Sequence, residues 1–367
     1  MPTEPQSLFL LGSSHRVASL EERERINLPA DRKESFYEGL RALPGMKECL
    51  VLNTCNRTEI YGTGNGTNPL EAVKKYLADF RQLEAEFIAK HFYQREGEAV
   101  VKHAFEVASG LDSQMVGETE ILGQVKEAYE DALNRKSAGK TLNRVFQKSF
   151  QAAKWARTHT GISRGQVNLG NVICELTRRI FGDVAASRLL IVGAGEVAEL
   201  AMTAFHSRGT RAITVTGRTF DWCPLSRKKP EELAERVDGF TLGFNTFQES
   251  LHLFDIVLCS TAKGDPIITM EAIQKALTQR PARPLFLIDV AMPRDIEESV
   301  GTLENVYLYN LDDVSAIANE NLENRKGEVE RCRDALAKRA SNIWNQLTGS
   351  PRPPSASNQS ATERSAG

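Results

Sequence analysis

The sequence predicts an α/β protein with two domains and a long helix near the C-terminus. The chain has 367 residues, which is enough for two or three domains of ordinary size. Its second half alternates short apolar runs with stretches of helical spacing, the pattern of a doubly wound, mostly parallel sheet. From Asp312 to Leu347 the chain has no proline, and Asp312 and Asp313 favour a helix start.

The first half predicts a small α/β domain over residues 1–160. The expected strands are residues 7–11, 49–53 and 57–62, and the expected helical stretches are residues 17–43 and 69–80, followed by two consecutive helices between residues 98 and 160. A polar turn of Thr54, Cys55 and Asn56 separates the second strand from the third.

The second half predicts a domain over residues 161–310. The expected strands are residues 188–192, 211–216, 254–259, 284–290 and 305–308, and the expected helices are residues 196–207 and 269–278. Residues 311–348 follow as one long helix. Residues 349–367 contain five serines and three prolines but no large apolar side chain. This tail buries too little surface to offset the entropy of ordering it, so we expect it to be disordered.

The composition narrows the class of protein. Forty-six basic residues oppose 48 acidic ones, so the net charge of −2 gives no overall attraction to nucleic acid or membranes. No apolar run approaches the ~18 residues of a membrane helix, and no Lys or Arg precedes Arg16 as a signal peptide requires. The six cysteines show no zinc-type spacing. We therefore expect a cytoplasmic protein with reduced thiols and no metal site.

A glycine-rich turn follows the first strand of the second domain. It comes directly after the apolar residues 189–192, opens a helix, and consists of Gly193, Ala194, Gly195, Glu196, Val197 and Ala198. Glycines allow a tight turn and close approach of the backbone, and the helix N-terminus presents unpaired N–H groups to a pyrophosphate. This context favours a dinucleotide-binding loop of the Rossmann type over a plain strand-to-helix turn.

The end of the next strand indicates which dinucleotide binds. A site for NADH usually has an acidic residue there, whereas this chain has Gly217, Arg218 and Thr219. A guanidinium and a hydroxyl suit the 2′-phosphate of NADPH, which we expect as the cofactor; the alternative is that Arg218 is a solvated surface residue. Residues 289–295 end a later strand and are expected to line the nicotinamide pocket or the domain junction.

Cys55 is the candidate nucleophile. It lies in a polar turn, and Arg57 can stabilise a thiolate or hold a substrate carboxylate. The alternative is a small core residue, which is our interpretation of the other five cysteines. A thiol in one half and a dinucleotide loop in the other suggest capture of an acyl group and its reduction to an aldehyde. His103, on a predicted helix, is either an acid or base or a structural histidine.

Several long motifs, in this order, resemble the glutamyl-tRNA reductase family. They are His15-Arg16 with residues 21–24, residues 54–61 (TCNRTEIY), residues 109–113 leading into residues 117–126, and residues 193–198 and 289–295 of the second half. The resemblance extends from Ser14 to about Leu347.

The resemblance implies that Cys55 attacks the ester carbonyl of glutamyl-tRNA and that NADPH reduces the resulting thioester to glutamate-1-semialdehyde, the first step of five-carbon tetrapyrrole synthesis. It matches His103 to the family's activity-critical histidine and Arg57 to a partner of the substrate α-carboxylate. The positions that it implies for the glutamyl moiety are Thr54, Cys55, Asn56, Arg57, Ser113, Glu118, Thr119, Glu120 and Gln124. The implied phosphate loop for NADPH is residues 193–198.

The resemblance also implies partners. Glutamyl-tRNA is the substrate, and the glutamate-1-semialdehyde aminomutase that follows in the pathway is an expected partner. Family members dimerise through a helical bundle that continues the long spinal helix, whereas a Ser/Pro-rich stretch follows Leu347 here, so we expect a truncated dimerisation region. Smaller departures are Thr119-Glu120 in place of Pro-Gln, and Gly217 and Ser14 each in place of Asn.

The local charge is compatible with an RNA substrate. Between Gly139 and Ile180 the chain has eight basic residues and one acidic residue, Glu175. This stretch is either a phosphate-binding face or an ordinary solvated helix surface.

Two other functions would require some of the same motifs. A dehydrogenase of small hydroxy or keto acids needs the phosphate loop but not Cys55, and a nucleotide- or tRNA-binding regulator tolerates the loss of Cys55.

Overall fold

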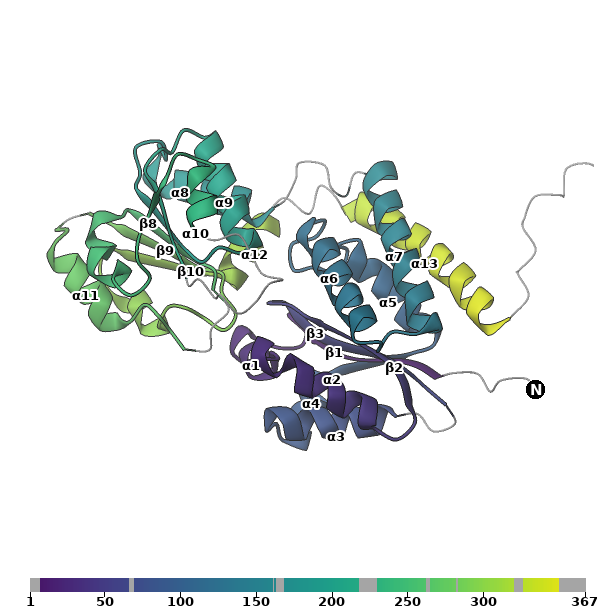
Figure 1. Ribbon diagram of the computed structural model, residues 1–367. Helices are drawn as coiled ribbons and strands as arrows, with labels where there is room; N and C mark the ends of the chain where they lie inside the picture. Colours follow the sequence, from purple (N-terminus) through teal and green to yellow (C-terminus); the bar gives the residue numbers. More distant parts are fainter. Residues whose placement is uncertain are drawn as a thin grey trace, which may run out of the picture.

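The computed structural model describes residues 7–65, 69–160, 162, 168–217, 230–261, 265–281, 283–319 and 326–349. These residues form two α/β halves, each built on its own sheet (Figure 1). The N-terminal half has an antiparallel sheet and the second half a parallel one. The predicted fold class is therefore confirmed.

The sheet of the N-terminal half has four strands in the order β2-β3-β1-β4. They are β1 (Ser7–Ser14), β2 (Met46–Asn53), β3 (Arg57–Gly64) and β4 (Tyr93–Glu96). The first three were predicted, β1 and β2 from apolar runs and β3 from its place directly after the polar turn. β4 gave no such signal because it is a short edge strand whose last three residues are exposed.

Helices cover both faces of this sheet. In Figure 1, α2, α3 and α4 lie below the sheet, and α5, α6 and α7 lie above it. The helices of this half are α1 (Leu20–Ile26), η1 (Ala30–Arg32), α2 (Lys33–Ala42), α3 (Leu70–Arg81), α4 (Ala85–His91), α5 (Glu98–Ala108), α6 (Glu120–Asn134) and α7 (Lys140–His159). Their apolar faces and the sheet enclose one core, with Phe9, Tyr61 and Phe146 fully buried.

Between residues 98 and 160 the structure has three helices instead of the expected two. A loop of residues 109–119 separates α5 from α6. Gly110 and Gly117 in this loop have φ angles of 74° and 86°, a left-handed conformation that other residues adopt only with strain. The expected stretch 17–43 is also broken, because α1 ends at Ile26, shortly before Pro29.

The second half is a doubly wound sheet of six parallel strands in the order β10-β9-β8-β5-β6-β7. The strands are β5 (Leu189–Val192), β6 (Ile213–Thr216), β7 (Phe240–Thr241), β8 (Ile256–Cys259), β9 (Leu285–Asp289) and β10 (Val306–Asn310), and the helices are α8 (Leu169–Phe181), α9 (Glu196–Ser207), α10 (Pro230–Glu235), η2 (Phe247–Leu253), α11 (Met270–Thr278) and η3 (Glu298–Thr302). The strand order reverses beside β5, so the glycine-rich turn after β5 lies at the usual ligand-binding edge.

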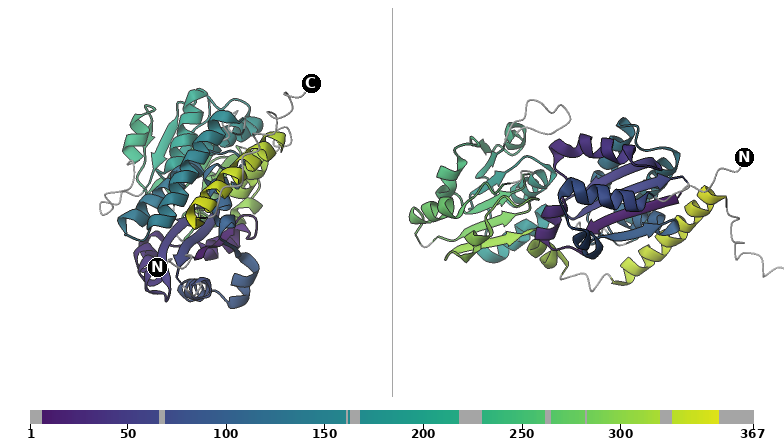
Figure 2. Two further views of the ribbon diagram at one scale, coloured as in Figure 1. Left: turned by 90° about the vertical axis from the view of Figure 1, so that its right-hand side faces the viewer. Right: turned by 90° about the horizontal axis from the view of Figure 1, so that it is seen from below.

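The single long helix expected over residues 311–348 is described as two helices. α12 (Leu311–Asn319) packs against α8 of the second half, whereas α13 (Lys326–Thr348) packs against α5 and α7 of the N-terminal half (Figure 2). Residues 320–325 lie outside the described residues. The two helices have apolar faces that belong to different cores: Leu311 and Val314 join one, and Leu336 and Ile343 join the other.

The structure thus has a long C-terminal helix, α13, of 23 residues. The predicted disordered tail lies outside the described residues, apart from Gly349. Within the described ranges, every helix is too short or too polar to span a membrane.

Candidate functional site

Cys55 lies at the tip of a tight turn between β2 and β3. The two strands are paired in antiparallel register up to Asn53 and Thr58. Thr54 closes the turn: its N–H donates to the carbonyl of Arg57 at 2.8 Å, and its Oγ1 accepts the N–H groups of Asn56 and Arg57, both at 3.2 Å. A polar residue at position 54 therefore shapes the backbone that presents the thiol.

The Cys55 side chain is half-buried against the second half of the protein. It packs on an apolar cluster that includes Met115 of the 109–119 loop and Ala194 of the phosphate loop. Burial, with a further contribution from the Glu118 carboxylate, raises the pKa of the thiol to about 12. Arg23 and Arg57 oppose this shift but do not reverse it. Cys55 is therefore a thiol in this structure.

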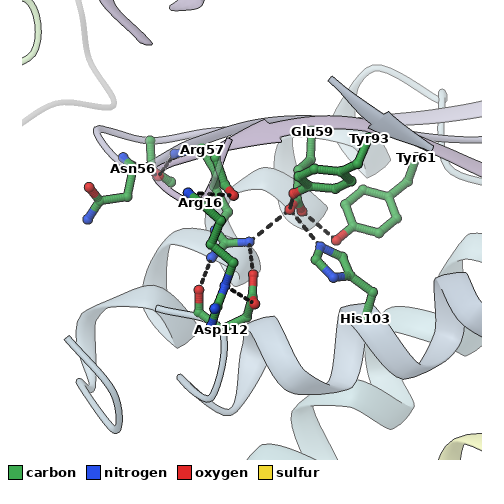
Figure 3. A network of polar contacts seen from close by, with 10 residues as sticks. Arg16, Asn56, Arg57, Glu59, Tyr61, Tyr93, His103 and Asp112 are labelled. Atoms are coloured by element: carbon green, nitrogen blue, oxygen red, sulfur yellow. Dashed lines mark hydrogen bonds and ion pairs between the residues drawn. The ribbon is translucent and has the colours of Figure 1, made fainter. Parts of the chain in front are cut away.

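Arg57 is bound to carboxylates beneath the turn. Its Nη1 lies 2.8 Å from Oε1 of Glu59 and 3.1 Å from Oδ2 of Asp112, and only 2% of the residue is exposed (Figure 3). Arg16 completes the chain of contacts by donating to Oδ1 of Asp112 at 2.8 Å. Arg57 lowers the pKa of the Cys55 thiol only in part, because its charge is shared with Glu59 and Asp112. Its two predicted roles, to stabilise a thiolate or to hold a substrate carboxylate, stay predictions.

His103 joins the same network at its other end. Its Nε2 lies 2.7 Å from Oε1 of Glu59, and the hydroxyls of Tyr61 and Tyr93 donate to Glu59 at 2.6 and 2.5 Å (Figure 3). Although burial opposes it, the charges of His103 and Arg57 hold the pKa of Glu59 well below its usual range. His103 is buried on α5 and is a partner of Glu59.

The other predicted substrate residues lie on the 109–119 loop and at the start of α6. Burial, with smaller contributions from Glu120 and Glu196, raises the pKa of Glu118 to about 7. Ser113 is buried, Thr119 is exposed, and Gln124 is half-buried on α6. The Glu118 charge raises the pKa of Cys55, and the Glu196 charge raises that of Glu118, so the thiol, this carboxyl group and the phosphate loop are electrostatically coupled. A carboxyl group with this pKa can accept the proton of a thiol.

The glycine-rich turn fits a dinucleotide. Gly193 has a φ of 117°, and a Cβ there would lie 2.8 Å from the carbonyl oxygen of Ser260, so only glycine fits. At Gly195 a Cβ would meet no atom of the described residues within 4 Å, so these residues leave open space in front of the loop. The N-cap of α9 is Gly195, which has no side chain, and in the part of the chain that the structure describes no other side chain is hydrogen-bonded to the first N–H groups of this helix, which can therefore bind a phosphate. Ala194 and Val197 are half-buried, and Ala198 is buried where α9 packs on the sheet. Arg218 and Thr219 lie outside the described residues.

Residues 289–295 lie at the junction of the two halves, one of the two places expected for them. The backbone N–H of Arg294 donates to Oε1 of Glu24 at 2.8 Å, and its Nε donates to the same oxygen at 3.1 Å. Both carboxylate oxygens of Asp289 accept backbone N–H groups, from Ala291 at 3.1 Å and from Ile296 at 2.8 Å, and these bonds fix the segment.

A cavity of about 430 Å³ opens beside Ser113, between the N-terminal half and helices α12 and α13. Its polar lining comes from His15, Arg16, Gln114, Asp312, Asn319 and Arg333. Burial and the charge of Arg57 lower the pKa of His15 to about 4, so its ring is neutral. The cavity gives a bound molecule room next to the predicted substrate residues.

Sequence reasoning missed five residues of this site: Arg23, Glu59, Asp112, Gln114 and Asp312. Glu59 and Asp112 fall inside the motifs that carry the resemblance, but nothing in the sequence indicated their ionic partners. Arg23 and Asp312 are 289 residues apart, and only the packing of the two halves brings them together.

Comparisons with known protein families match the two halves of the chain separately. A family model described as "Glutamyl-tRNAGlu reductase, N-terminal domain" matches residues 11–160, and one described as "Shikimate / quinate 5-dehydrogenase" matches residues 175–317. The second match and the geometry of the phosphate loop indicate a pyridine-nucleotide cofactor.

Individual relatives extend the similarity over most of the chain. "Glutamyl-tRNA reductase" of Geotalea uraniireducens is 38% identical over 326 residues, which cover 89% of this chain and 74% of the relative. The protein of the same name from Akkermansia muciniphila is 38% identical over 338 residues, which cover 90% of this chain and 96% of the relative. The solved structure of glutamyl-tRNA reductase from Methanopyrus kandleri is 31% identical, covers 93% of this chain and 80% of its own, and superposes with a TM-score of 0.50. The chain therefore belongs to the glutamyl-tRNA reductase family.

Proposed function

We propose that this protein reduces the aminoacyl ester of glutamyl-tRNA to glutamate-1-semialdehyde with NADPH, and that Cys55 is the nucleophile. The observation that carries the proposal is the position of Cys55, at the tip of its turn and packed on the half that contains the phosphate loop. A thiol placed there can hold an acyl group where a bound nicotinamide can reach it.

The chemistry needs one covalent intermediate on the protein. The Cys55 sulfur attacks the ester carbonyl carbon; a C–S bond forms, the bond to the ribose oxygen breaks, and the tRNA leaves with a proton. We propose that Glu118, whose charge acts on the thiol, takes the proton that Cys55 loses and passes it to the ribose oxygen of the departing tRNA. A nicotinamide cofactor whose pyrophosphate is held by residues 193–198 would supply the hydride to the carbonyl carbon. The C–S bond then breaks, which releases the aldehyde and restores the Cys55 thiol once a proton returns.

The glutamyl moiety is proposed to contact the turn and the 109–119 loop. Thr54 and Asn56 flank the thiol, and Ser113 lies beside the cavity. The remaining proposed contacts are Arg57, Glu118, Thr119, Glu120 and Gln124. In this proposal Arg57 binds the α-carboxylate of the substrate. Because Arg57 is already paired with Glu59 and Asp112, the substrate carboxylate must either share the guanidinium with them or displace one of them.

For the cofactor we propose NADPH. Its pyrophosphate is bound at Gly193, Ala194, Gly195, Glu196, Val197 and Ala198, and its 2′-phosphate at Arg218 and Thr219. The open space at Gly195 and the uncapped start of α9 support the pyrophosphate position.

Helix α7 supports a tRNA substrate. Lys140, Arg144, Lys148 and Lys154 lie on one side of this helix, and it contains no acidic residue. Within the described chain none of the four forms an ion pair with a carboxylate, whereas Arg178 and Arg179 on α8 are both paired with Glu175.

The α7 helix leads away from the active site. Arg157 in its last turn donates to the carbonyl of Thr119 at 3.0 Å, next to Glu118. The whole helix is about 30 Å long, given its 20 residues at about 1.5 Å each, and most of that length runs from Arg157 to the start of the helix at Lys140. We propose that this basic face of α7, formed by the four cations without a carboxylate partner in the described chain, binds phosphates of the tRNA while the aminoacyl end of the tRNA lies at Cys55.

We propose that each predicted domain has its own function. We propose residues 1–160 as the catalytic domain, residues 161–310 as the nucleotide-binding domain and residues 311–348 as the spinal region.

The five described cysteines are free thiols, which supports a cytoplasmic location. Handover of the reactive aldehyde to the aminomutase is the partnership that this product chemistry favours.

The experiment is aldehyde formation by the purified protein. Glutamyl-tRNA with NADPH is compared with free glutamate plus NADPH and with glutamyl-tRNA plus NADH. We expect turnover of the charged tRNA alone and a preference for NADPH. Cys55→Ser should keep NADPH binding and lose turnover, and Cys49→Ala, which changes a buried thiol on the adjoining strand β2, is the matched control. Unchanged turnover of Cys55→Ser would rule out the thioester.

A further inference from the structure

We propose that Arg23 is a positioning residue that fixes the Cys55 turn and docks it onto the nucleotide-binding half through Asp312. The inference rests on the proposed function and adds residues to it. Arg23 lies on α1 and is only 5% exposed. Its guanidinium reaches the turn on one side and helix α12 on the other.

Arg23 contacts two hydrogen-bond acceptors of the turn, both of them on half-buried residues. Nη1 of Arg23 donates to Oδ1 of Asn56 at 2.7 Å and to the backbone carbonyl of Cys55 at 3.3 Å. A charged donor on these two acceptors holds the turn in one conformation, and with it the direction of the Cys55 side chain. The local structure supports this, because a capping box of Ser19 and Glu22 starts α1 and Nε of Arg23 donates to the Ser19 carbonyl at 3.4 Å.

The contact on the other side crosses the domain junction. Nη2 of Arg23 lies 2.5 Å from Oδ1 of Asp312, in the first turn of α12. The same oxygen accepts a hydrogen bond from Gln114 of the 109–119 loop at 2.7 Å. Asn319, also on α12, donates to the Gln114 carbonyl at 2.5 Å. Asp312 therefore connects α12 to both parts of the site, the Cys55 turn and the loop that carries Ser113 and Glu118.

The Arg23–Asp312 ion pair forms only when the two halves are docked against each other. A guanidinium that is almost fully buried needs a carboxylate to neutralise it, and Asp312 supplies that charge from the other half. The acceptors that Arg23 has on the turn, the Cys55 carbonyl and the Asn56 side-chain amide, are neutral. Separation of the halves would therefore remove the carboxylate partner of Arg23 in the described chain, Asp312. The ion pair thus favours the arrangement in which Cys55 lies against the nucleotide-binding half.

A second ion pair across the same junction provides a matched control. Glu24, the next residue of α1, pairs with Arg294 at 3.1 Å. This pair also joins α1 to the second half, but neither residue contacts the Cys55 turn through a hydrogen bond in the described chain. If any junction ion pair had the same effect, Asp312→Asn and Glu24→Gln would behave alike.

The first test measures Cys55 without substrate or cofactor. Iodoacetamide modification of Cys55 is followed by peptide mass spectrometry in the full-length protein. We expect Asp312→Asn to raise the modification rate on the order of tenfold, the effect of losing a charged hydrogen bond, and Glu24→Gln to change it less than about twofold. Asp312→Glu should restore the slow rate. Equal rates in wild type and Asp312→Asn would overturn the proposal.

The second test separates the two half-reactions. Cys55-dependent release of tRNA is measured without cofactor, and aldehyde formation is measured with NADPH. Asp312→Asn keeps the contacts of Arg23 with the turn, so we expect tRNA release to persist while the ratio of aldehyde to released tRNA falls on the order of tenfold. Arg23→Met should lower both. A wild type that forms no aldehyde would refute the proposed function, whereas the modification rates would still decide the docking role.

Discussion

Nε2 of His103 lies 2.7 Å from Oε1 of Glu59, a fully buried carboxylate. Glu59 also accepts hydrogen bonds from Tyr61 and Tyr93 and is paired with Arg57. His103 is thus connected to the Cys55 turn through Glu59 and Arg57. His103 and Arg57 thus share one carboxylate, and the predicted catalytic role of His103 stays a prediction.

Glu59→Gln should strongly destabilise the protein. The substitution leaves the buried charge of Arg57 with Asp112 as its remaining carboxylate, and loss of one partner of a buried pair costs about 3–5 kcal/mol. Because the folded-state pKa of Glu59 is lowered, this stability is present above its ordinary value of 4.5 and is lost as the pH falls below it. Denaturant unfolding at pH 7 and pH 3.5 measures both effects.

Tyr93→Phe is the control for this prediction. It removes one hydroxyl donor to Glu59 and leaves every charge in place, so the free energy of unfolding should fall by about 1 kcal/mol. The interpretation of Glu59 as the centre of the network fails if Glu59→Gln costs no more than Tyr93→Phe.

Glu118→Gln should change the reactivity of Cys55 in a pH-dependent way. The Glu118 carboxylate raises the pKa of the thiol, and its own pKa is about 7. Above pH 7 the substitution removes a negative charge, so the pKa of Cys55 falls and iodoacetamide modification becomes faster. Below pH 6 Glu118 is already mostly protonated in the wild type, and the two proteins should react at similar rates.

Turnover of the same variant should move in the opposite direction. If Glu118 accepts the thiol proton, Glu118→Gln loses aldehyde formation by about 10²–10⁴-fold even though the thiol is more acidic. In the wild type, kcat/KM for glutamyl-tRNA should rise through pH 7 as Glu118 ionises. A variant with both faster modification and undiminished turnover shows that Glu118 affects Cys55 only through its charge.

Replacing the four cations on the basic face of α7 by glutamine should weaken binding of glutamyl-tRNA. If Lys140, Arg144, Lys148 and Lys154 each contact a phosphate, the slope of log K against log salt concentration should become shallower by about 3. NADPH binding should not change. The double variant Arg178→Gln, Arg179→Gln is the control, because both arginines are already paired with Glu175. Equal slopes for the two variants contradict the assignment of the face.

Glu48→Ala should destabilise the N-terminal half without a direct effect on chemistry. The Glu48 carboxylate accepts the N–H groups of Thr141 and Leu142 at 3.1 and 2.7 Å and so caps the start of α7. Loss of such a cap costs about 1–2 kcal/mol, which thermal unfolding can detect. Glu48→Gln keeps one acceptor and should cost less. A Glu48→Ala protein as stable as Glu48→Gln shows that water replaces the cap.

The local parts of this protein could be predicted from its sequence. β2 and β5 have apolar runs, and the glycines at 193 and 195 follow β5 directly, so these strands and the phosphate loop were predicted together. The polar turn at Cys55 was also predicted after the apolar run of β2, with β3 directly after the turn. The substrate and cofactor roles of these residues stay predictions.

Elements without a local pattern were missed. β4 pairs with β1 at the edge of its sheet, where its side chains need not be apolar. The expected single C-terminal helix has an uninterrupted helical sequence, yet α12 and α13 bury their apolar faces in different halves. Sequence periodicity shows that a face is apolar but not which core receives it.

The sequence by itself determined the two α/β halves, the position of the phosphate loop and the candidate thiol, because each depends on residues that are neighbours in the chain. The tertiary structure alone decided the contacts around the thiol. Arg23 with Asp312, Arg57 with Asp112 and His103 with Glu59 join segments that are far apart in the sequence. These charges become partners only when packing removes them from water, and that packing depends on how both halves fold and dock.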